Sequence, residues 1–216
     1  MYRPGRFTLL ALLAYCVLVK VTPYVLWQFG MDIHSNSIYP WTFTPIFAVG
    51  ILGAGLFRNL RIGLGLPIVA FAVSDLLIGL LAAVRYGWED GLASAIYPGM
   101  VFNYLALVAA TLCGTLLRGR TSGRFRWVGI FAMAVLAPSL FFLISNFGAW
   151  AFVSEIGFSR DLNGLWQAYV AGLPFYRNSL ISTVGFCALL FSPLGIRQLQ
   201  LVPEVAPAKS SAVHSV

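Results

Sequence analysis

Charged side chains are scarce in this sequence: they make up 10% of its 216 residues, whereas 59% are hydrophobic. Soluble domains carry about 25% charged residues, so this composition excludes an ordinary soluble domain and favours several membrane-spanning helices. Acids are rarer than bases, with 7 Asp and Glu against 14 Lys and Arg. The bases lie in short loops between apolar runs, which membrane topology explains better than nucleic-acid binding. We therefore expect the lipid bilayer, and no nucleic acid, as a partner.

Reactive and metal-binding residues are also few. The three cysteines, Cys16, Cys113 and Cys187, lie within apolar runs and lack Cys-x-x-Cys spacing, as is typical of small buried hydrophobic residues. His34 and His214 fall in a loop and in the tail, so a metal site inside the membrane lacks ligands. The chain has no Gly-x-Ser-x-Gly, His-Glu-x-x-His or Walker motif. We expect no enzyme activity, no cofactor and no metal.

The apolar runs predict an all-α, polytopic membrane protein. Residues 1–196 are expected to form one six-helix transmembrane domain, and the small and polar residues 197–216 a disordered cytoplasmic tail. The N-terminus has the basic start and apolar run of a signal peptide, but no Ala-x-Ala site follows, which favours a retained first helix. The last predicted unit is interrupted at Pro174. The predicted helical segments are 7–27, 45–57, 62–84, 96–117, 128–152 and 164–192.

The segment 43–81 combines two features around which the rest of the chain is organised. Its first apolar run is short and carries Gly50, Gly53 and Gly55, which predict close contact with neighbouring helices. Its second run carries Asp75 deep within an apolar segment. A charge at such a depth is unfavourable by about 2.5–3.5 kcal/mol on insertion scales. Asp75 is therefore expected to face a bundle interior, a cavity or a partner of opposite charge.

The charge of the loops predicts the orientation of the helices, because loops that face the cytoplasm carry an excess of Lys and Arg. With both termini cytoplasmic, ten basic residues fall inside and three outside, and Lys20 remains within the first helix. Trp27, Trp41, Trp88 and Trp150 then fall near the outer boundary, as in an aromatic belt. The inner bases are Arg3, Arg6, Arg58, Arg61, Arg118, Arg120, Arg124, Arg126, Arg197 and Lys209; the outer loops hold Arg85, Arg160 and Arg177 with the acids Asp32, Glu89, Asp90, Glu155 and Asp161.

Strong hydrogen-bonding groups gather in the outer half of the predicted bundle. At about 1.5 Å per residue, Lys20 and Asp75 both lie roughly 20 Å from the inner ends of their helices. The two opposite charges thus share a level and are expected to pair, directly or through one polar group. Asn103 lies at about 21 Å and Asn146 near 27 Å on the same count.

Two interpretations of these polar groups remain open. In one they are contacts between helices, with Lys20 and Asp75 as a structural ion pair and Arg177 reaching the interface by snorkelling. In the other they line a cavity that opens to the outside, because aromatic walls with a few placed polar groups are typical of small-molecule sites. The candidate substrate-binding residues are Asp75, Asn103, Asn146, Trp150, Arg177 and Asn178.

Each candidate has an expected role in the second interpretation. Asp75 shapes the polarity of the pocket, and Asn103 and Asn146 supply hydrogen bonds. Trp150 stacks against the solute, and Arg177 attracts an anionic group.

Four segments resemble a family of small bacterial membrane proteins of unknown function that are described as putative transport proteins. They are TFTPIFAVGILGAGLF, PIVAFAVSDLLIGL, FFLISNFGAW and YVAGLPFYRNSLISTVGFCALLF, within residues 39–191. The distinctive parts are Ser-Asp-x-x-x-Gly at 74–79 and Asn-Phe-Gly-x-Trp at 146–150. That family in turn is similar to the S-components of energy-coupling-factor transporters. The resemblance implies a six-helix bundle, a site near the outer face and an energising transporter module as a partner.

These observations lead to two functional hypotheses. The first is a small-solute transport protein or substrate-binding membrane subunit in the cell (inner) membrane, with an outward-facing polar pocket and a small-molecule ligand. The second is a non-transport membrane scaffold or assembly factor whose polar groups serve helix packing. Because the chain has no nucleotide motif, any use of ATP would require a partner.

Overall fold

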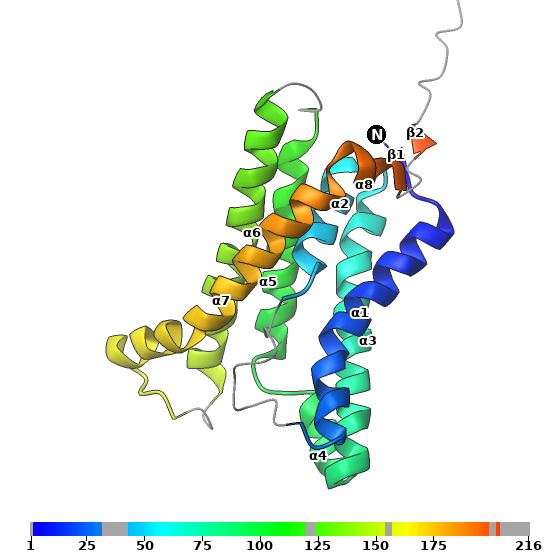
Figure 1. Cartoon of the computed structure of the whole chain (residues 1–216). Helices are drawn as coiled ribbons and strands as arrows, with labels where there is room; N and C mark the ends of the chain where they lie inside the picture. Colours follow the sequence, from blue (N-terminus) through cyan, green and yellow to red (C-terminus); the bar gives the residue numbers. More distant parts are fainter. Residues whose placement is uncertain (1, 32–42, 120–123, 154–156, 199–201, 204–216) are drawn as a thin grey trace, which may run out of the picture.

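The computed structural model describes residues 2–31, 43–119, 124–153, 157–198 and 202–203. Several residues of the sequence analysis lie outside these ranges, among them His34, Trp41 and the tail from 204 to 216. The described chain is a bundle of helices with one short strand pair (Figure 1). The elements are β1 (Tyr2–Arg3), α1 (Arg6–Gln28), α2 (Ile46–Leu56), α3 (Leu60–Tyr86), α4 (Trp88–Ala95), α5 (Met100–Leu112), the 3-10 helix η1 (Cys113–Leu117), α6 (Arg124–Phe152), α7 (Leu162–Leu190), α8 (Pro193–Gln198) and β2 (Val202–Pro203).

Four helical stretches of the described chain are long and apolar enough to cross a membrane. Their length and composition are consistent with a multi-pass membrane protein. Two of the six predicted segments are not among the four: α2 is too short, and α7 contains polar residues such as Gln167, Arg177 and Asn178 that lower its mean hydropathy. The four stretches are Arg6–Gln28, Leu60–Tyr86, Trp88–Leu117 and Arg126–Phe152.

The short helix α2 is the centre of the bundle. All 11 of its residues are buried, and it contacts α3, α5, α6, α7 and η1. An 11-residue helix is about 16 Å long, roughly half the thickness of the hydrocarbon core. The N-terminus of α2 therefore lies inside the protein, where non-helical backbone at membrane depth is tolerated because other helices enclose it.

Glycines allow the neighbours of α2 to approach it closely, as the sequence predicted. A Cβ atom at Gly53 would lie 2.8 Å from the Cα of Gly63 in α3, which is too close for any side chain. A Cβ at Gly55 would lie 3.0 Å from the carbonyl oxygen of Gly114 in η1, and one at Gly50 would also collide with its neighbour. The expected close contacts of Gly50, Gly53 and Gly55 are thus confirmed, and they explain how a helix with no polar face packs at the centre.

Helix α4 was not predicted, and its segment was assigned to a loop because it contains Glu89 and Asp90. The chain turns back at Gly87, whose φ of 105° is readily adopted only by glycine. Both acids then lie in the first turn of α4, where the helix dipole favours negative charge. The predicted helix over 96–117 is consequently shorter, because α5 begins at Met100. Close packing of α4 on α3 follows from small residues: a Cβ at Gly79 would lie 2.8 Å from the carbonyl oxygen of Gly91.

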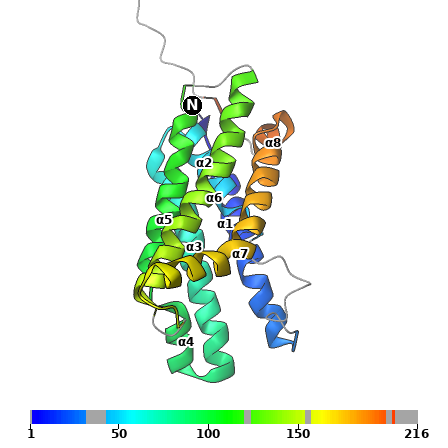
Figure 2. The same ribbon diagram turned by 90° about the vertical axis from the view of Figure 1, so that its left-hand side faces the viewer.

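The predicted interruption at Pro174 is wrong, because α7 continues as one helix from Leu162 to Leu190. Proline removes one backbone hydrogen bond and bends a helix without always ending it. Figure 2 shows this result, since α7 begins across the bundle and then turns to run along it. Asp161 starts the helix by accepting hydrogen bonds from the Gly164 backbone N–H, at 2.8 Å, and from the Ser159 hydroxyl, at 2.7 Å. These bonds hold the pKa of the Asp161 carboxyl below its usual value.

Arg118 and Arg126 lie at one end of the bundle, which we call the basic end. Figure 1 shows β1, β2, α8 and the start of α6 at this end. Arg118 donates to the carbonyl oxygens of Ala54 and Phe57 at the end of α2, and Arg126 donates to that of Phe191 at the end of α7. These arginines satisfy carbonyl groups that a helix leaves unpaired at its C-terminus.

The tail predicted to be disordered begins with ordered residues. Helix α8 extends to Gln198, and β2 pairs with β1 in an antiparallel register that places Tyr2 opposite Pro203 and Arg3 opposite Val202. This pairing ties the two ends of the described chain together at the basic end.

Candidate functional site

Lys20 in α1 and Asp75 in α3 lie in contact inside the bundle. Lys20 Nζ is 2.7 Å from Asp75 Oδ1, and the hydroxyl of Tyr104 in α5 donates to Asp75 Oδ2 at 3.1 Å. Asp75 is only 6% exposed, so both of its oxygens are paired away from solvent. The ammonium also lies over the ring of Phe71, 3.2 Å from its centroid, and this ring packs edge-on against Tyr104. We call Lys20, Phe71, Asp75 and Tyr104 the charge cluster.

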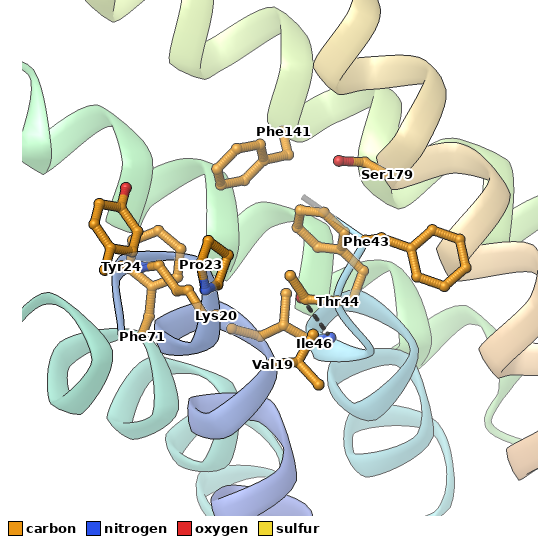
Figure 3. A pocket seen from close by; sticks show the side chains of 11 residues that line it. Val19, Lys20, Pro23, Tyr24, Phe43, Thr44, Ile46, Phe71, Phe141 and Ser179 are labelled. Atoms are coloured by element: carbon orange, nitrogen blue, oxygen red, sulfur yellow. Dashed lines mark hydrogen bonds between the residues drawn. The ribbon is translucent and has the colours of Figure 1, made fainter. Parts of the chain in front are cut away.

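A cavity of about 180 Å³ borders the charge cluster, and we call it the lysine cavity. Figure 3 shows Lys20, Tyr24 and Phe71 on one side of it and Ser179 on another, with Thr44 at the start of α2 between them. Aromatic rings from α1, α2, α3, α6 and the segment before α2 form much of its wall. The lining residues are Val19, Lys20, Pro23, Tyr24, Phe43, Thr44, Ile46, Phe47, Phe71, Phe141 and Ser179.

A second cavity, of about 340 Å³, lies between α5, α6 and α7, and we call it the asparagine cavity. It contains two of the predicted substrate-binding residues, Asn103 and Asn146. Glycine on the facing helix leaves room for the side-chain amide of Asn146, because a Cβ at Gly172 would displace this amide from its present position. The lining residues are Asn103, Pro138, Phe141, Phe142, Ser145, Asn146, Ala149, Gly172, Phe175, Tyr176 and Ser179.

Phe141 and Ser179 line both cavities, so the two spaces are neighbours separated by these side chains. Ser179 is 7% exposed. Its carbonyl oxygen accepts from the hydroxyls of Ser182 and Thr183, whereas its own hydroxyl has no hydrogen-bond partner among the residues that the structure describes. Figure 3 shows this hydroxyl directed toward Phe141, at the border of the two cavities. A hydroxyl that borders a cavity and has no partner among the described residues is available to a ligand.

The remaining predicted site residues do not join these two. Trp150 donates its indole N–H to the carbonyl oxygen of Ser159 at 2.8 Å, and it lines neither cavity. Arg177 is exposed and Asn178 is half-buried, and neither lines either cavity. Asp75 lies in the charge cluster, behind Lys20. The predicted convergence of these residues on one pocket is therefore not the observed arrangement, which splits them among a charge cluster, a cavity and the surface.

The sequence that forms this bundle and both cavities matches the model of one protein family. This protein belongs to DUF6580, a family of unknown function. The family model matches residues 3–205, nearly the whole chain. No curated protein and no solved structure matches the chain. Membership in DUF6580 carries no activity with it, and the comparisons do not link the chain to transport proteins or to S-components.

Helix periodicity explains which residues of this DUF6580 protein reach the asparagine cavity. On α7 the lining residues Gly172, Phe175, Tyr176 and Ser179 follow i, i+3, i+4, i+7 spacing, which places them on one face. Arg177 lies on the opposite face by the same count.

Sequence reasoning missed Phe141, Tyr176 and Ser179. The same count finds them from other starting points: Phe141 lies four residues before Ser145 on α6, and Tyr176 and Ser179 lie four and seven residues after Gly172 on α7. The hydroxyl of Tyr176 is 2.9 Å from that of Ser139, which fixes the ring at the cavity wall.

Proposed function

We propose that this protein binds a small solute within the membrane, as a substrate-binding membrane subunit or a small-solute transport protein of the cell (inner) membrane. The observation that carries the proposal is the asparagine cavity, where amide and hydroxyl groups from three helices line one largely apolar space. Its volume of about 340 Å³ is in the range of small-ligand pockets, roughly 300–1,000 Å³. Apolar walls with a few polar groups are the usual composition of such sites.

The proposal includes an orientation with six membrane-crossing segments and both termini in the cytoplasm. The gathering of arginines at the basic end supports it, because positively charged loops remain on the cytoplasmic side. The lysine cavity is lined by the second half of α1 and the asparagine cavity by the start of α5, and both include Phe141 in the second half of α6. These parts of the helices lie toward the end opposite the basic end (Figure 1). A solute would therefore enter from the outside.

Cysteine labelling tests this orientation. In a variant with Cys16, Cys113 and Cys187 replaced by Ala, we expect Arg61→Cys at the basic end to resist an impermeant thiol reagent in intact cells. Glu89→Cys in the first turn of α4 should react, because both side chains are exposed and only the membrane separates them from the reagent. Permeabilised cells, in which both should react, are the control. Reaction of Arg61→Cys alone in intact cells would reverse the orientation.

Native mass spectrometry of the purified protein tests solute binding. We expect a small molecule to co-purify with the natural protein and to be at least tenfold depleted in Asn103→Ala/Asn146→Ala, since both amides line the cavity. Asn163→Ala, which removes an exposed amide on α7, should retain it. The thermal stability of the empty protein should change little in all three. Unfolding of the double variant, together with the absence of any bound molecule in the natural protein, would reject the proposal.

A second candidate function is a membrane scaffold or assembly factor. It is favoured by the hydrogen bonds that the predicted site residues make within the protein. Asn103 donates to the hydroxyl of Tyr97 at 2.9 Å, and Asn146 donates to the carbonyl oxygen of Phe142 at 2.8 Å. Polar groups satisfied in this way also serve helix packing. The mass spectrometry experiment separates the two functions.

The role of an S-component, with an energising transporter module as partner, is the specific form of the proposal that the sequence resemblance implies. Because the chain lacks a nucleotide motif, such a module would supply any ATP hydrolysis.

A further inference from the structure

The ammonium group of Lys20 has one N–H for which no described residue supplies an acceptor. A lysine ammonium has three donors. One points to Asp75 Oδ1 at 2.7 Å, and a second faces the ring of Phe71, whose centroid is 3.2 Å from Nζ. The third is left for the lysine cavity, which Lys20 lines. A hydrogen-bond acceptor in the cavity would complete the coordination of this nitrogen.

The electrostatics of the lysine cavity favour a negatively charged acceptor. Among the described residues that line it there is no Asp or Glu, and Asp75 has both oxygens occupied by Lys20 and Tyr104. The cavity also contains the start of α2, where Thr44 and Ile46 are lining residues. A helix N-terminus carries a partial positive charge, and α2 is wholly buried, so water screens this charge little. The hydroxyl of Thr44 accepts from the Ile46 N–H at 3.2 Å, which leaves its own proton free to donate.

The wall of the lysine cavity opposite Lys20 carries a second hydrogen-bonding group, the hydroxyl of Ser179. Figure 3 places the hydroxyl of Ser179 across the cavity from Lys20, beside Phe141. Ser179 is 7% exposed, and its hydroxyl, which borders the cavity, has no hydrogen-bond partner among the described residues. Between the two polar sites the wall consists mainly of the rings of Phe43, Phe47 and Phe71. Aromatic walls favour a flat, apolar body, because rings stack or pack edge-on against one another.

We propose that the lysine cavity binds a small monocarboxylate with a flat apolar body and a hydrogen-bonding group at its far end. The carboxylate accepts from Lys20, the body packs among the phenylalanine rings, and the far group bonds to Ser179 at the border of the asparagine cavity. This inference rests on the proposed solute-binding function and names the substrate class. It gives Lys20 two roles, as the partner of Asp75 and as a ligand-binding residue.

Three matched probes test the substrate class: para-hydroxybenzoate, para-hydroxybenzamide and benzoate. The amide has the shape of the first acid without its charge, and benzoate lacks the far hydroxyl. Binding to the purified full-length protein is measured by isothermal titration calorimetry in detergent. We expect para-hydroxybenzoate to bind at least tenfold more tightly than para-hydroxybenzamide, because only the acid carries the charge that Lys20 attracts.

Two variants assign the two ends of the ligand. Lys20→Met/Asp75→Asn removes both charges together, so no unpaired charge is left to unfold the bundle, and it should abolish the preference for the acid over the amide. Ser179→Ala should weaken para-hydroxybenzoate by about fivefold, as expected for one hydrogen bond, and leave benzoate unchanged. Ser192→Ala, at the basic end and remote from both cavities, is the control and should bind like the natural protein.

The outcomes separate this inference from the proposed function. Equal binding of the acid and the amide, or preference for the acid that survives in Lys20→Met/Asp75→Asn, would overturn the carboxylate assignment while solute binding stands. Failure of both acids to bind would overturn it as well. In that case a co-purifying neutral or cationic molecule would preserve the proposed function, and the absence of any co-purifying molecule would reject both.

Discussion

Asp75→Asn is expected to lower the free energy of unfolding by about 3–5 kcal/mol, the range for removing one partner of a buried ion pair. The substitution would leave the ammonium of Lys20 inside the bundle without the oxygen that now lies 2.7 Å away. Adding Lys20→Met to the same protein should restore part of the loss, because it removes the uncompensated charge. Unfolding in mixed micelles with increasing denaturing detergent measures both effects.

The matched control is Asp90→Asn, which removes an exposed carboxylate at the start of α4. It should change the free energy of unfolding by no more than about 0.5 kcal/mol, as is usual for surface substitutions. The Lys20→Met/Asp75→Asn variant tests whether the two charges are coupled. If it is as unstable as the sum of the two single variants, the ion pair contributes no coupling energy to the fold.

Arg118→Met is expected to be the second large effect, with a loss of about 3 kcal/mol. The guanidinium donates to the carbonyl oxygens of Ala54, at 2.7 Å, and Phe57, at 3.1 Å. Hydrogen bonds from charged groups contribute about 1.5–3 kcal/mol each. These two close the C-terminal end of α2, the only described helix whose residues are all buried, and buried carbonyl groups without a partner are costly.

The control for Arg118 is Arg61→Met, which removes an exposed arginine at the same end of the bundle and should be nearly neutral. Arg118→Lys should recover less than half of the loss, since an ammonium does not reproduce the fork that reaches two carbonyl groups. Equal stability of the Arg118 and Arg61 variants, measured by the same detergent titration, would show that α2 does not need this cap.

The positions of the helices could be predicted from local sequence properties. The first helix was expected over 7–27 and is Arg6–Gln28, and the third was expected over 62–84 and is Leu60–Tyr86. Hydropathy finds such segments because the transfer of each side chain into an apolar environment is a local quantity. Helix α4 was missed for the same reason: Glu89 and Asp90 lower its hydropathy, while its small residues, which pack on α3, contribute almost nothing to it.

Only part of the candidate site could be predicted from the sequence. The depth of a residue along its helix follows from local sequence, but the direction in which its side chain faces depends on how the helix is rotated against its neighbours. A rise of about 1.5 Å per residue places Lys20 and Asp75 at one level. The same count placed Asn146 and Trp150 near each other in depth. It could not show that Asn146 faces a cavity and that Trp150 binds the carbonyl oxygen of Ser159 instead.

The amino-acid sequence by itself determined that the chain forms helices long and apolar enough to cross a membrane, with its bases in the loops and a few polar groups at similar depths. Each of these properties follows from the residues of one segment at a time. Only the tertiary structure decided which faces meet. The approach of α2 to α3 depends on Gly53 lying opposite Gly63, and the asparagine cavity depends on Gly172 lying opposite Asn146. Such pairings arise from close packing between segments distant in the chain, and no property of either segment alone specifies the partner.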